Sequence, residues 1–538
     1  MNRIFFLVFL LFSFLNSFNQ IYEKKYTDKL TEVFQYITTK YVDTVDQKKI
    51  TRIAIENILE SLDPHSVYIP KDKVKEAEEP LIGNFDGIGI QFNILKDTII
   101  VISPISGGPS EKLGILSGDR IIYIEDELVA GIDITNKGVQ KRLKGPKGTI
   151  VNIKILRRGI SELIPFEIVR DKIPIHSVDA EYMIDNHTGY IKLNKFSGNT
   201  IEEFENAVFN LKEQGMTDLI LDLSNNGGGY LQASLFLSDH FLSNDNLMLT
   251  IKGKSGPPEN FNSNMHFFMP EPWRSKPFNA FENGRLIIMI DEGSASASEI
   301  VSGAVQDNDR GVIIGRRSFG KGMVQKPIYL SDSSMVRLTI KRFYTPSGRC
   351  IQKPYDEGVE KYYGEVYKRY ENGELINKDS IIFPDSLKYK TSNKREVYGG
   401  GGIMPDIFVP LDTNWTSDLY VNIARKGHQN TFCLNYVNKN RSLLNKNYAN
   451  VSEFNNGFDI KTEVEEDFIK FIKKEKIDYK PEEYIRSQRV INEQLKALIA
   501  RNLWGTNAYF YIINNINSMY HKAIEVISSE RYKKILDN

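Results

Sequence analysis

The chain has 538 residues, of which 41% are hydrophobic and 26% are charged, a composition that is ordinary for a soluble globular protein. This length exceeds what one hydrophobic core organises, so we expect three or four domains. Lys and Arg together number 69, as do Asp and Glu, so the charge balance favours neither nucleic acid nor an anionic membrane as a partner. The two cysteines, Cys350 and Cys433, allow at most one disulfide, and we expect no metal and no other cofactor.

The N-terminal residues 1–19 contain one positive charge, Arg3, followed by an apolar run at 4–15. A membrane span needs roughly 20 apolar residues, so this shorter run is typical of a secretory signal. The cleavage site before Gln20 is poor, which leaves an uncleaved anchor as an alternative, and we expect membrane association only in that case. The segment predicts a location in the periplasm or cell envelope.

The rest of the chain divides into four regions by pattern. Residues 20–82 have apolar positions at helical spacing, and residues 83–170 have short Ile- and Val-rich runs separated by Gly, Pro and Asp. Strand and helix patterns alternate over 171–410, interrupted by a polar stretch at 352–395 that reads as an insertion or mobile excursion. Residues 411–538 are helical in pattern. We therefore predict a multi-domain α/β protein with an inserted β-rich domain and helical regions at both ends.

The segment GSASASEI at 293–300 joins an apolar strand pattern to a helical pattern. A turn of small residues here lets a hydroxyl project, and it places that hydroxyl near the positive end of the helix dipole. Ser296 is therefore a candidate nucleophile, with an ordinary Ser-rich helix cap as the alternative.

A serine nucleophile needs a base, and the seven histidines are scattered without a motif around any of them. Lys321, flanked by glycines in SFGKG, is the candidate, because burial can make a lysine neutral at working pH. The stretch 315–321 also fits the first seven positions of a phosphate-binding loop. Gly322 replaces the required hydroxyl and a strand pattern follows, so we reject nucleotide binding.

Acyl transfer also needs backbone N–H groups where negative charge develops on the substrate carbonyl. Residues 225–229, with sequence NNGGG, follow a strand pattern and can supply such donors, because glycine permits unusual dihedrals and close approach. A flexible turn is the alternative at this segment.

In combination, these motifs resemble the C-terminal processing peptidases, also called tail-specific proteases. The resemblance extends over residues 60–406 and includes LDPHS, GIGI, SGDRI, LILDLSNNGGGYL, GSASASEI, VQD, GRRSFGKGMVQ, YTPSGR and GGIMPD in order. It implies Ser296 as nucleophile, Lys321 as general base and Gln325 as the residue that orients the lysine. It further implies Gly228 and Ala297 as oxyanion donors and a structural role for Asp307. Relatives commonly carry Arg where this chain has Ser224, which puts the geometry of the oxyanion turn in question.

The resemblance also identifies the β-rich region as a PDZ domain, in which Gly87, Ile88, Gly89 and Ile90 form the loop that captures a substrate's C-terminal carboxylate. The implied function is a serine endopeptidase that cuts envelope polypeptides near their free C-termini. An adaptor or a second copy of the chain is a further expected partner. The alternative is a catalytically silent scaffold whose PDZ domain retains peptide binding.

Overall fold

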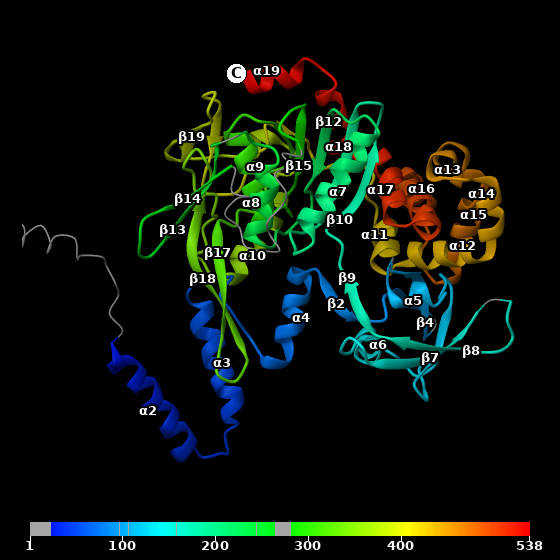
Figure 1. Ribbon diagram of the computed structural model, residues 1–538, viewed down its shortest axis with the longest axis horizontal. Helices are drawn as coiled ribbons and strands as arrows, with labels where there is room; N and C mark the ends of the chain where they lie inside the picture. Colours follow the sequence, from blue (N-terminus) through cyan, green and yellow to red (C-terminus); the bar gives the residue numbers. More distant parts are fainter. Residues whose placement is uncertain are drawn as a thin grey trace, which may run out of the picture.

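The computed structural model describes residues 23–537 except positions 96, 106, 158, 244 and 264–280. Its elements form an α/β core, an inserted β-rich domain, and helical regions before and after them (Figure 1). This confirms the predicted multi-domain α/β class. The expected signal or anchor at 1–19 lies outside the described residues. Within the described part of the chain, no helix combines the length and apolar character needed to cross a bilayer.

The core is built on a sheet with strand order β10-β11-β12-β15-β16-β21, in which only the β10–β11 pair is antiparallel. Parallel strands with helices on both faces are buried, as β11, β12, β15 and β16 are here. The turns that follow β12 and β15 lie side by side at one edge of this sheet, because neighbouring parallel strands end there together. The strands are β10 (Val178–Met183), β11 (Thr188–Leu193), β12 (Asp218–Asp222), β15 (Leu286–Ile290), β16 (Val312–Gly315) and β21 (Ile407–Phe408).

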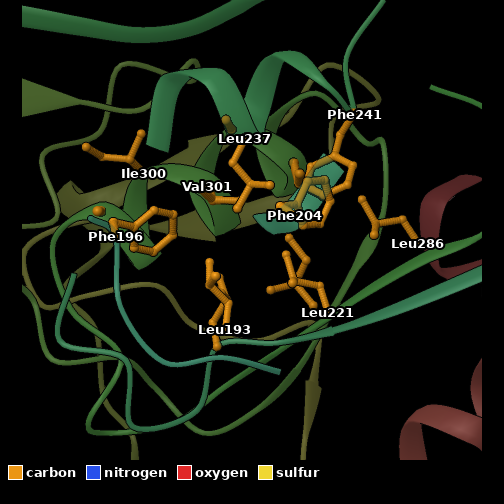
Figure 2. Close-up of a cluster of buried hydrophobic side chains, with 14 of the residues drawn as sticks. Leu193, Phe196, Phe204, Leu221, Leu237, Phe241, Leu286, Ile300 and Val301 are labelled. Carbon is orange, nitrogen blue, oxygen red and sulfur yellow. The ribbon is translucent and has the colours of Figure 1, made fainter. Parts of the chain in front are cut away.

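Helices from distant parts of the chain cover the two faces of this sheet. α7 (Thr200–Glu213), α8 (Leu231–Asp239) and α9 (Ala297–Asp307) enclose a large hydrophobic cluster, part of which is drawn in Figure 2. α18 (Ser518–Ile527) and α19 (Arg531–Asp537) cover the opposite face. The residues packed there are Tyr190, Ile220, Ile287, Met289, Val312, Ile314, Met519, Tyr520, Ala523, Val526, Ile527 and Tyr532.

A second sheet, of order β1-β18-β13-β14 with β17 also paired to β18, flanks the core. Its first strand comes from the N-terminal region, because Val67–Ile69 pair with residues 335–337 of β18. The turn at 62–66 is thereby held against the core. The strands are β1 (Val67–Ile69), β13 (Leu247–Gly253), β14 (Glu259–Asn262), β17 (Met323–Tyr329) and β18 (Met335–Tyr344).

The helices before the inserted domain are α2 (Lys24–Lys40), α3 (Gln47–Glu60) and α4 (Lys71–Ile82). The domain itself has a sheet of order β3-β4-β5-β7-β8, with β6 paired to β5, so β3 is an edge strand. β2 pairs with β9 where the chain enters and leaves the domain. Its elements are β2 (Asn84–Gly87), β3 (Ile90–Leu95), β4 (Thr98–Pro104), α5 (Pro109–Lys112), β5 (Arg120–Ile124), β6 (Glu127–Leu128), α6 (Asn136–Leu143), β7 (Ile150–Leu156), β8 (Ile164–Val169) and β9 (Asp171–Pro174).

The predicted C-terminal helical region forms a bundle with a hydrophobic core of its own. α18 and α19 leave this bundle and return to the core sheet, which Tyr511 of the bundle also contacts through Tyr182 of β10. Cys433, in the bundle, and Cys350, in the core, are both free thiols. The bundle elements are α11 (Asp418–Arg425), α12 (His428–Asn447), α13 (Val451–Gly457), α14 (Ile460–Glu463), α15 (Glu465–Lys474), α16 (Pro481–Trp504), α17 (Thr506–Ile513) and η4 (Asn514–Ile516).

The polar stretch at 352–395 is folded, which corrects the alternative of a mobile excursion. It contains α10 (Val359–Glu371), η2 (Lys378–Ser380), η3 (Asp385–Leu387) and β19 (Lys388–Lys390), which pairs with β20 (Glu396–Tyr398) directly after the stretch. Its charged side chains suggested exposure to solvent. Several instead form ion pairs with the core, including Glu374 with Arg317 at 2.5 Å and Arg395 with Asp309 at 2.7 Å.

Candidate active site

Ser296 occupies the sharp turn between β15 and α9. Its φ of 55° and ψ of −110° are unusual for a residue with a side chain, and such backbone strain costs on the order of 1–3 kcal/mol. The turn directs Ser296 toward the end of the sheet, at the N-terminus of α9, where the helix dipole favours negative charge. A strained turn at this position is what a projecting nucleophile requires.

Glu299, one turn into α9, joins the serine turn to the lysine turn. Its fully buried carboxylate accepts the Ser296 N–H at 2.7 Å and the Lys321 N–H at 2.9 Å through Oε2. Oε1 accepts the Ser318 hydroxyl at 2.5 Å and the Gly320 N–H at 2.7 Å. Burial raises the pKa of this carboxyl, and the four donors oppose that rise. The sequence analysis missed Glu299, although its spacing from Ser296 matches a capping box.

Lys321 lies in the loop that leads into β17. Burial, followed by the positive charge of Arg337, lowers the pKa of Lys321 to about 8. Its Nζ donates to Oε1 of Gln325 at 3.1 Å. A lysine in this environment is substantially neutral at mildly alkaline pH, which a general base requires.

The backbone of the turn at 62–66 supports Gln325 through a hydrogen bond. The Gln325 amide donates to the carbonyl oxygen of His65, and the His65 ring contacts the Tyr362 hydroxyl through Nε2 at 2.9 Å. Asp63 fixes this turn by accepting the His65 N–H at 2.8 Å. Burial, followed by the charge of Lys321, lowers the pKa of His65 to about 4, so its ring is neutral at physiological pH. His65 is therefore a support for the site through Gln325.

Helix α10, within the stretch 352–395, supports the loop that contains Lys321. Arg369 donates to the Ser318 carbonyl at 2.8 Å and to the Phe319 carbonyl at 3.3 Å. The Tyr362 hydroxyl accepts from the Gln352 amide at 3.2 Å, and Gln352 in turn accepts the Gly322 N–H at 2.8 Å. The residues on both sides of Lys321 are therefore held by side chains that follow it in sequence.

The glycine turn after β12 lies against the serine turn. A Cβ on Gly228, whose φ is +95°, would lie 2.9 Å from Ser296 Cβ and 2.9 Å from the Ala297 nitrogen. Only glycine fits this position. The Gly228 N–H donates to Oδ1 of Asn226 at 2.9 Å. The two predicted oxyanion residues are thus neighbours, with one of the two N–H groups already hydrogen-bonded.

Lys192 on β11 supplies a positive charge beside Ser224. Its buried Nζ donates to the Ser224 carbonyl at 2.5 Å and lies 3.0 Å from Oδ1 of Asp222. Asp222 also accepts the Tyr190 hydroxyl at 2.7 Å. A neighbouring strand thus provides a cation at the start of the predicted oxyanion turn, beside Ser224.

A cavity of about 610 Å³ brings the predicted catalytic groups together. Among the described residues, no hydrogen bond joins the Ser296 hydroxyl to Nζ of Lys321, which donates to Gln325 instead. The predicted residues that line this cavity are Gly228, Ser296, Ala297, Lys321 and Gln325. The other lining residues are Glu78, Leu81, Gly227, Gly229, Tyr230, Leu231, Gln232, Ile300, Met323, Val324, Lys326, Pro327, Met335, Arg337, Ile340 and Phe343.

The predicted peptide-binding loop lies in the β-rich domain, apart from this cavity. Gly87 ends β2, and Ile88 and Gly89 connect it to β3, which begins at Ile90. The Ile88 carbonyl accepts the Ser110 hydroxyl at 2.6 Å, which fixes the loop. Gly89 has a φ of +74°. A fixed glycine loop beside an edge strand matches the way in which a peptide adds to a sheet.

Asp307, predicted to be structural, lies at the far end of α9. It forms an ion pair with Arg349 at 2.7 Å, and both side chains are completely buried. It also accepts the Ser347 N–H at 3.0 Å. These contacts join α9 to the segment after β18, and Asp307 does not line the catalytic cavity.

Four segments of the chain match known protein families. Residues 187–362 match Peptidase family S41 and residues 87–165 match the PDZ domain. Residues 15–73 match the N-terminal domain of the activating protease CtpB, and residues 419–505 match a family of unknown function, DUF8443. The fold and these matches define a serine-type peptidase that carries a PDZ domain.

Individual relatives show which serine-type peptidases this chain is similar to. The carboxy-terminal-processing protease of Bartonella bacilliformis is 34% identical over 402 residues, which cover 73% of this chain and 86% of that protein. CtpB of Bacillus subtilis is 34% identical over 62% of this chain and 67% of its own length. A solved photosystem II D1 C-terminal processing protease is 26% identical, with a TM-score of 0.33, over 60% of this chain and 89% of that one. The chain belongs to the carboxy-terminal processing proteases.

Proposed function

We propose that this protein is an endopeptidase that cuts envelope polypeptides near their free C-termini with a Ser296/Lys321 dyad. The observation that carries the proposal is the pair itself: a strained serine at a helix N-terminus and a lysine of pKa about 8 line one cavity. Glu299 supports it further, because one buried carboxylate binds the backbone of both residues.

In the proposed reaction, neutral Lys321 accepts the Ser296 proton while Oγ attacks the substrate carbonyl carbon. The resulting oxyanion is stabilised by the N–H groups of Ala297 and Gly228, the latter sharing or exchanging its bond to Asn226. The C–N bond then breaks, and Lys321 gives its proton to the leaving amine. A water molecule attacks the acyl-enzyme, loses its proton to Lys321, and the Ser296 hydroxyl is restored with release of the new carboxylate. Gln325 holds the Lys321 ammonium through this cycle.

The PDZ domain is proposed to select the substrate. The loop at 87–90 would bind the terminal carboxylate and β3 would pair with the preceding residues. The names of the relatives support C-terminal processing, and the apolar run at 4–15 supports a location in the envelope. We propose the division 1–19, 20–82, 83–170, 171–410 and 411–538 for the signal or anchor, the N-terminal helices, the PDZ domain, the peptidase core and the C-terminal helices.

The decisive experiment compares Ser296→Ala with the matched change Ser302→Ala, in the interior of α9. The Ser302 hydroxyl is buried and donates to the Ser298 carbonyl at 2.8 Å, so this control tests the loss of a buried hydroxyl from the same helix. We expect Ser296→Ala to abolish cleavage of an unfolded protein substrate and Ser302→Ala to retain it. Cleavage that survives Ser296→Ala would overturn the proposed nucleophile.

A further inference from the structure

The catalytic cavity contains a cation that the proposed mechanism does not use. Arg337 lies on β18, opposite Pro327 of β17, and its partly buried side chain lines the cavity. Within the described residues, no hydrogen bond or ion pair reaches its guanidinium. A charged group removed in part from water without a partner is unfavourable, and a guanidinium is shaped for bidentate binding of a carboxylate.

The nearby acidic side chains are already engaged. Oδ1 of Asp63 accepts the Ser66 N–H at 2.9 Å and the Thr339 hydroxyl at 3.1 Å, and Oδ2 accepts the Ser66 hydroxyl at 2.6 Å. Glu78 accepts the Tyr329 hydroxyl. Asp63 and Glu78 therefore each have another partner, and within the described residues the Arg337 guanidinium remains available to an incoming anion.

The walls around this guanidinium are apolar. Alternation along β18 places Met335 and Arg337 on the same face of the strand, because side chains two residues apart share a face. Met335 is buried and lines the same cavity, as do buried Ile300, Met323 and Phe343. The cavity thus offers the Arg337 guanidinium together with buried apolar side chains, which suits a substrate residue with an apolar side chain and a neighbouring carboxylate.

The place of Arg337 relative to Lys321 indicates which part of the substrate it meets. Arg337 and Lys321 line the same cavity, and the positive charge of Arg337 contributes to the lowered pKa of Lys321. In the proposed reaction Lys321 protonates the leaving amine, so the chain segment on the leaving side passes next to Lys321. A cation beside that lysine contacts the fragment that is released.

We propose that Arg337 binds a carboxylate of the leaving segment, so that cleavage favours bonds with a carboxylate a short distance beyond them. This inference rests on the proposed function. The carboxylate has two sources, the free C-terminus of the substrate or an Asp or Glu side chain within it. Binding of the C-terminus itself would make the enzyme release short C-terminal fragments.

The test measures kcat/KM of the full-length enzyme on a peptide with a free C-terminus, its C-terminal amide, and two amidated peptides that differ by Glu or Gln on the leaving side. Each substrate is assayed with wild type, Arg337→Gln, Arg337→Lys and the control Arg342→Gln. Arg342 is an exposed arginine on β18 that donates to the Tyr355 hydroxyl and does not line the cavity. Amidation also affects PDZ binding, but equally in every variant, so the ratio of acid to amide isolates the cavity.

We expect wild type and Arg342→Gln to cleave the carboxylate-bearing member of one peptide pair with the higher kcat/KM. In Arg337→Gln the ratio of kcat/KM within that pair should fall roughly tenfold, and Arg337→Lys should keep part of the preference. Loss confined to the acid and amide pair identifies the terminal carboxylate, and loss confined to the Glu and Gln pair identifies an acidic side chain. Unchanged ratios in Arg337→Gln, or an equal loss on all four peptides, overturn the role of Arg337 while leaving the dyad intact. Cleavage that persists in Ser296→Ala instead removes the proposed function.

Discussion

Replacement of Glu299 by Gln tests whether the serine and lysine turns act as one unit. Each carboxylate oxygen accepts two donors: Oε2 accepts the Ser296 and Lys321 N–H groups, and Oε1 accepts the Ser318 hydroxyl and the Gly320 N–H. Glutamine keeps one oxygen and presents an NH₂ in place of the other. Two buried donors therefore lose their acceptor, whichever way the amide is oriented.

The energetic cost follows from those two donors. An unsatisfied buried donor costs about 1–3 kcal/mol, so the pair costs about 2–6 kcal/mol, of which the neutral side chain regains part because burial of a carboxylate is itself unfavourable. Misplacement of the dyad by about 1 Å lowers a rate on the order of 100-fold. We expect Glu299→Gln to lower kcat by about that factor.

The pH dependence separates this explanation from a general loss of stability. The negative charge of Glu299 raises the pKa of Lys321, so its removal lowers that pKa below about 8. Because the base must be neutral, kcat rises with pH through the lysine pKa, and the rise should move to lower pH in Glu299→Gln. The assay is kcat against pH, with urea unfolding in parallel and Ser302→Ala as control. A variant with wild-type kcat and an unmoved profile would refute the reasoning.

Three further predictions follow from the same contacts. In the wild type, kcat should rise to half its maximum near pH 8, the pKa of Lys321, and a rate independent of pH from 6 to 10 would contradict this. Gln325→Glu places a carboxylate beside the Lys321 ammonium, so the rise in kcat should move to higher pH, and an unmoved profile would exclude the contact. Arg349→Met leaves Asp307 buried without its partner, which should cost about 3–5 kcal/mol in urea unfolding, and an unchanged midpoint would exclude a structural role for the pair.

The local part of the site could be predicted from the sequence. Ser296 stands out because small residues between a strand and a helix define a tight turn, and Lys321 because glycines flank it. Local sequence also excludes a phosphate-binding loop, because a strand pattern and not a helical pattern follows Gly322. The structure has strand β17 there. The roles of the site residues stay predictions until the variants are measured.

The supporting residues could not be predicted, because their partners are distant in the chain. Gln325 binds the backbone of His65, 260 residues away, and His65 meets Tyr362, 297 residues away. Arg369 binds carbonyls of the lysine loop from a stretch whose polarity suggested mobility. Lys192 stands beside Ser224 only because β11 and β12 are paired. Neither hydrophobic periodicity nor a local motif predicts contacts between residues so far apart in the sequence.

The sequence predicts that the C-terminal region is helical. It does not predict that most of these helices form a bundle while α18 and α19 pack on the core sheet. Most apolar positions within 418–504 are buried against one another, whereas Met519, Ala523 and Val526 are buried against the core sheet. Both groups have apolar residues at helical spacing. Periodicity shows that a helix has an apolar face, and the identity of the surface that covers this face depends on the tertiary fold.

The return of α18 and α19 to the core sheet affects the order in which the molecule can be completed (Figure 1). The sheet carries the turn of Ser296 and the glycine turn after β12, and one of its faces, with Ile220 and Met289, is covered by helices synthesised only after the whole helical bundle. During synthesis that face lacks its native cover, and exposed apolar surface of this kind promotes misassembly. The enzyme therefore reaches its native core only once residues 518–537 have emerged and docked, so formation of this core depends on a segment synthesised more than 200 residues after β15 and β16.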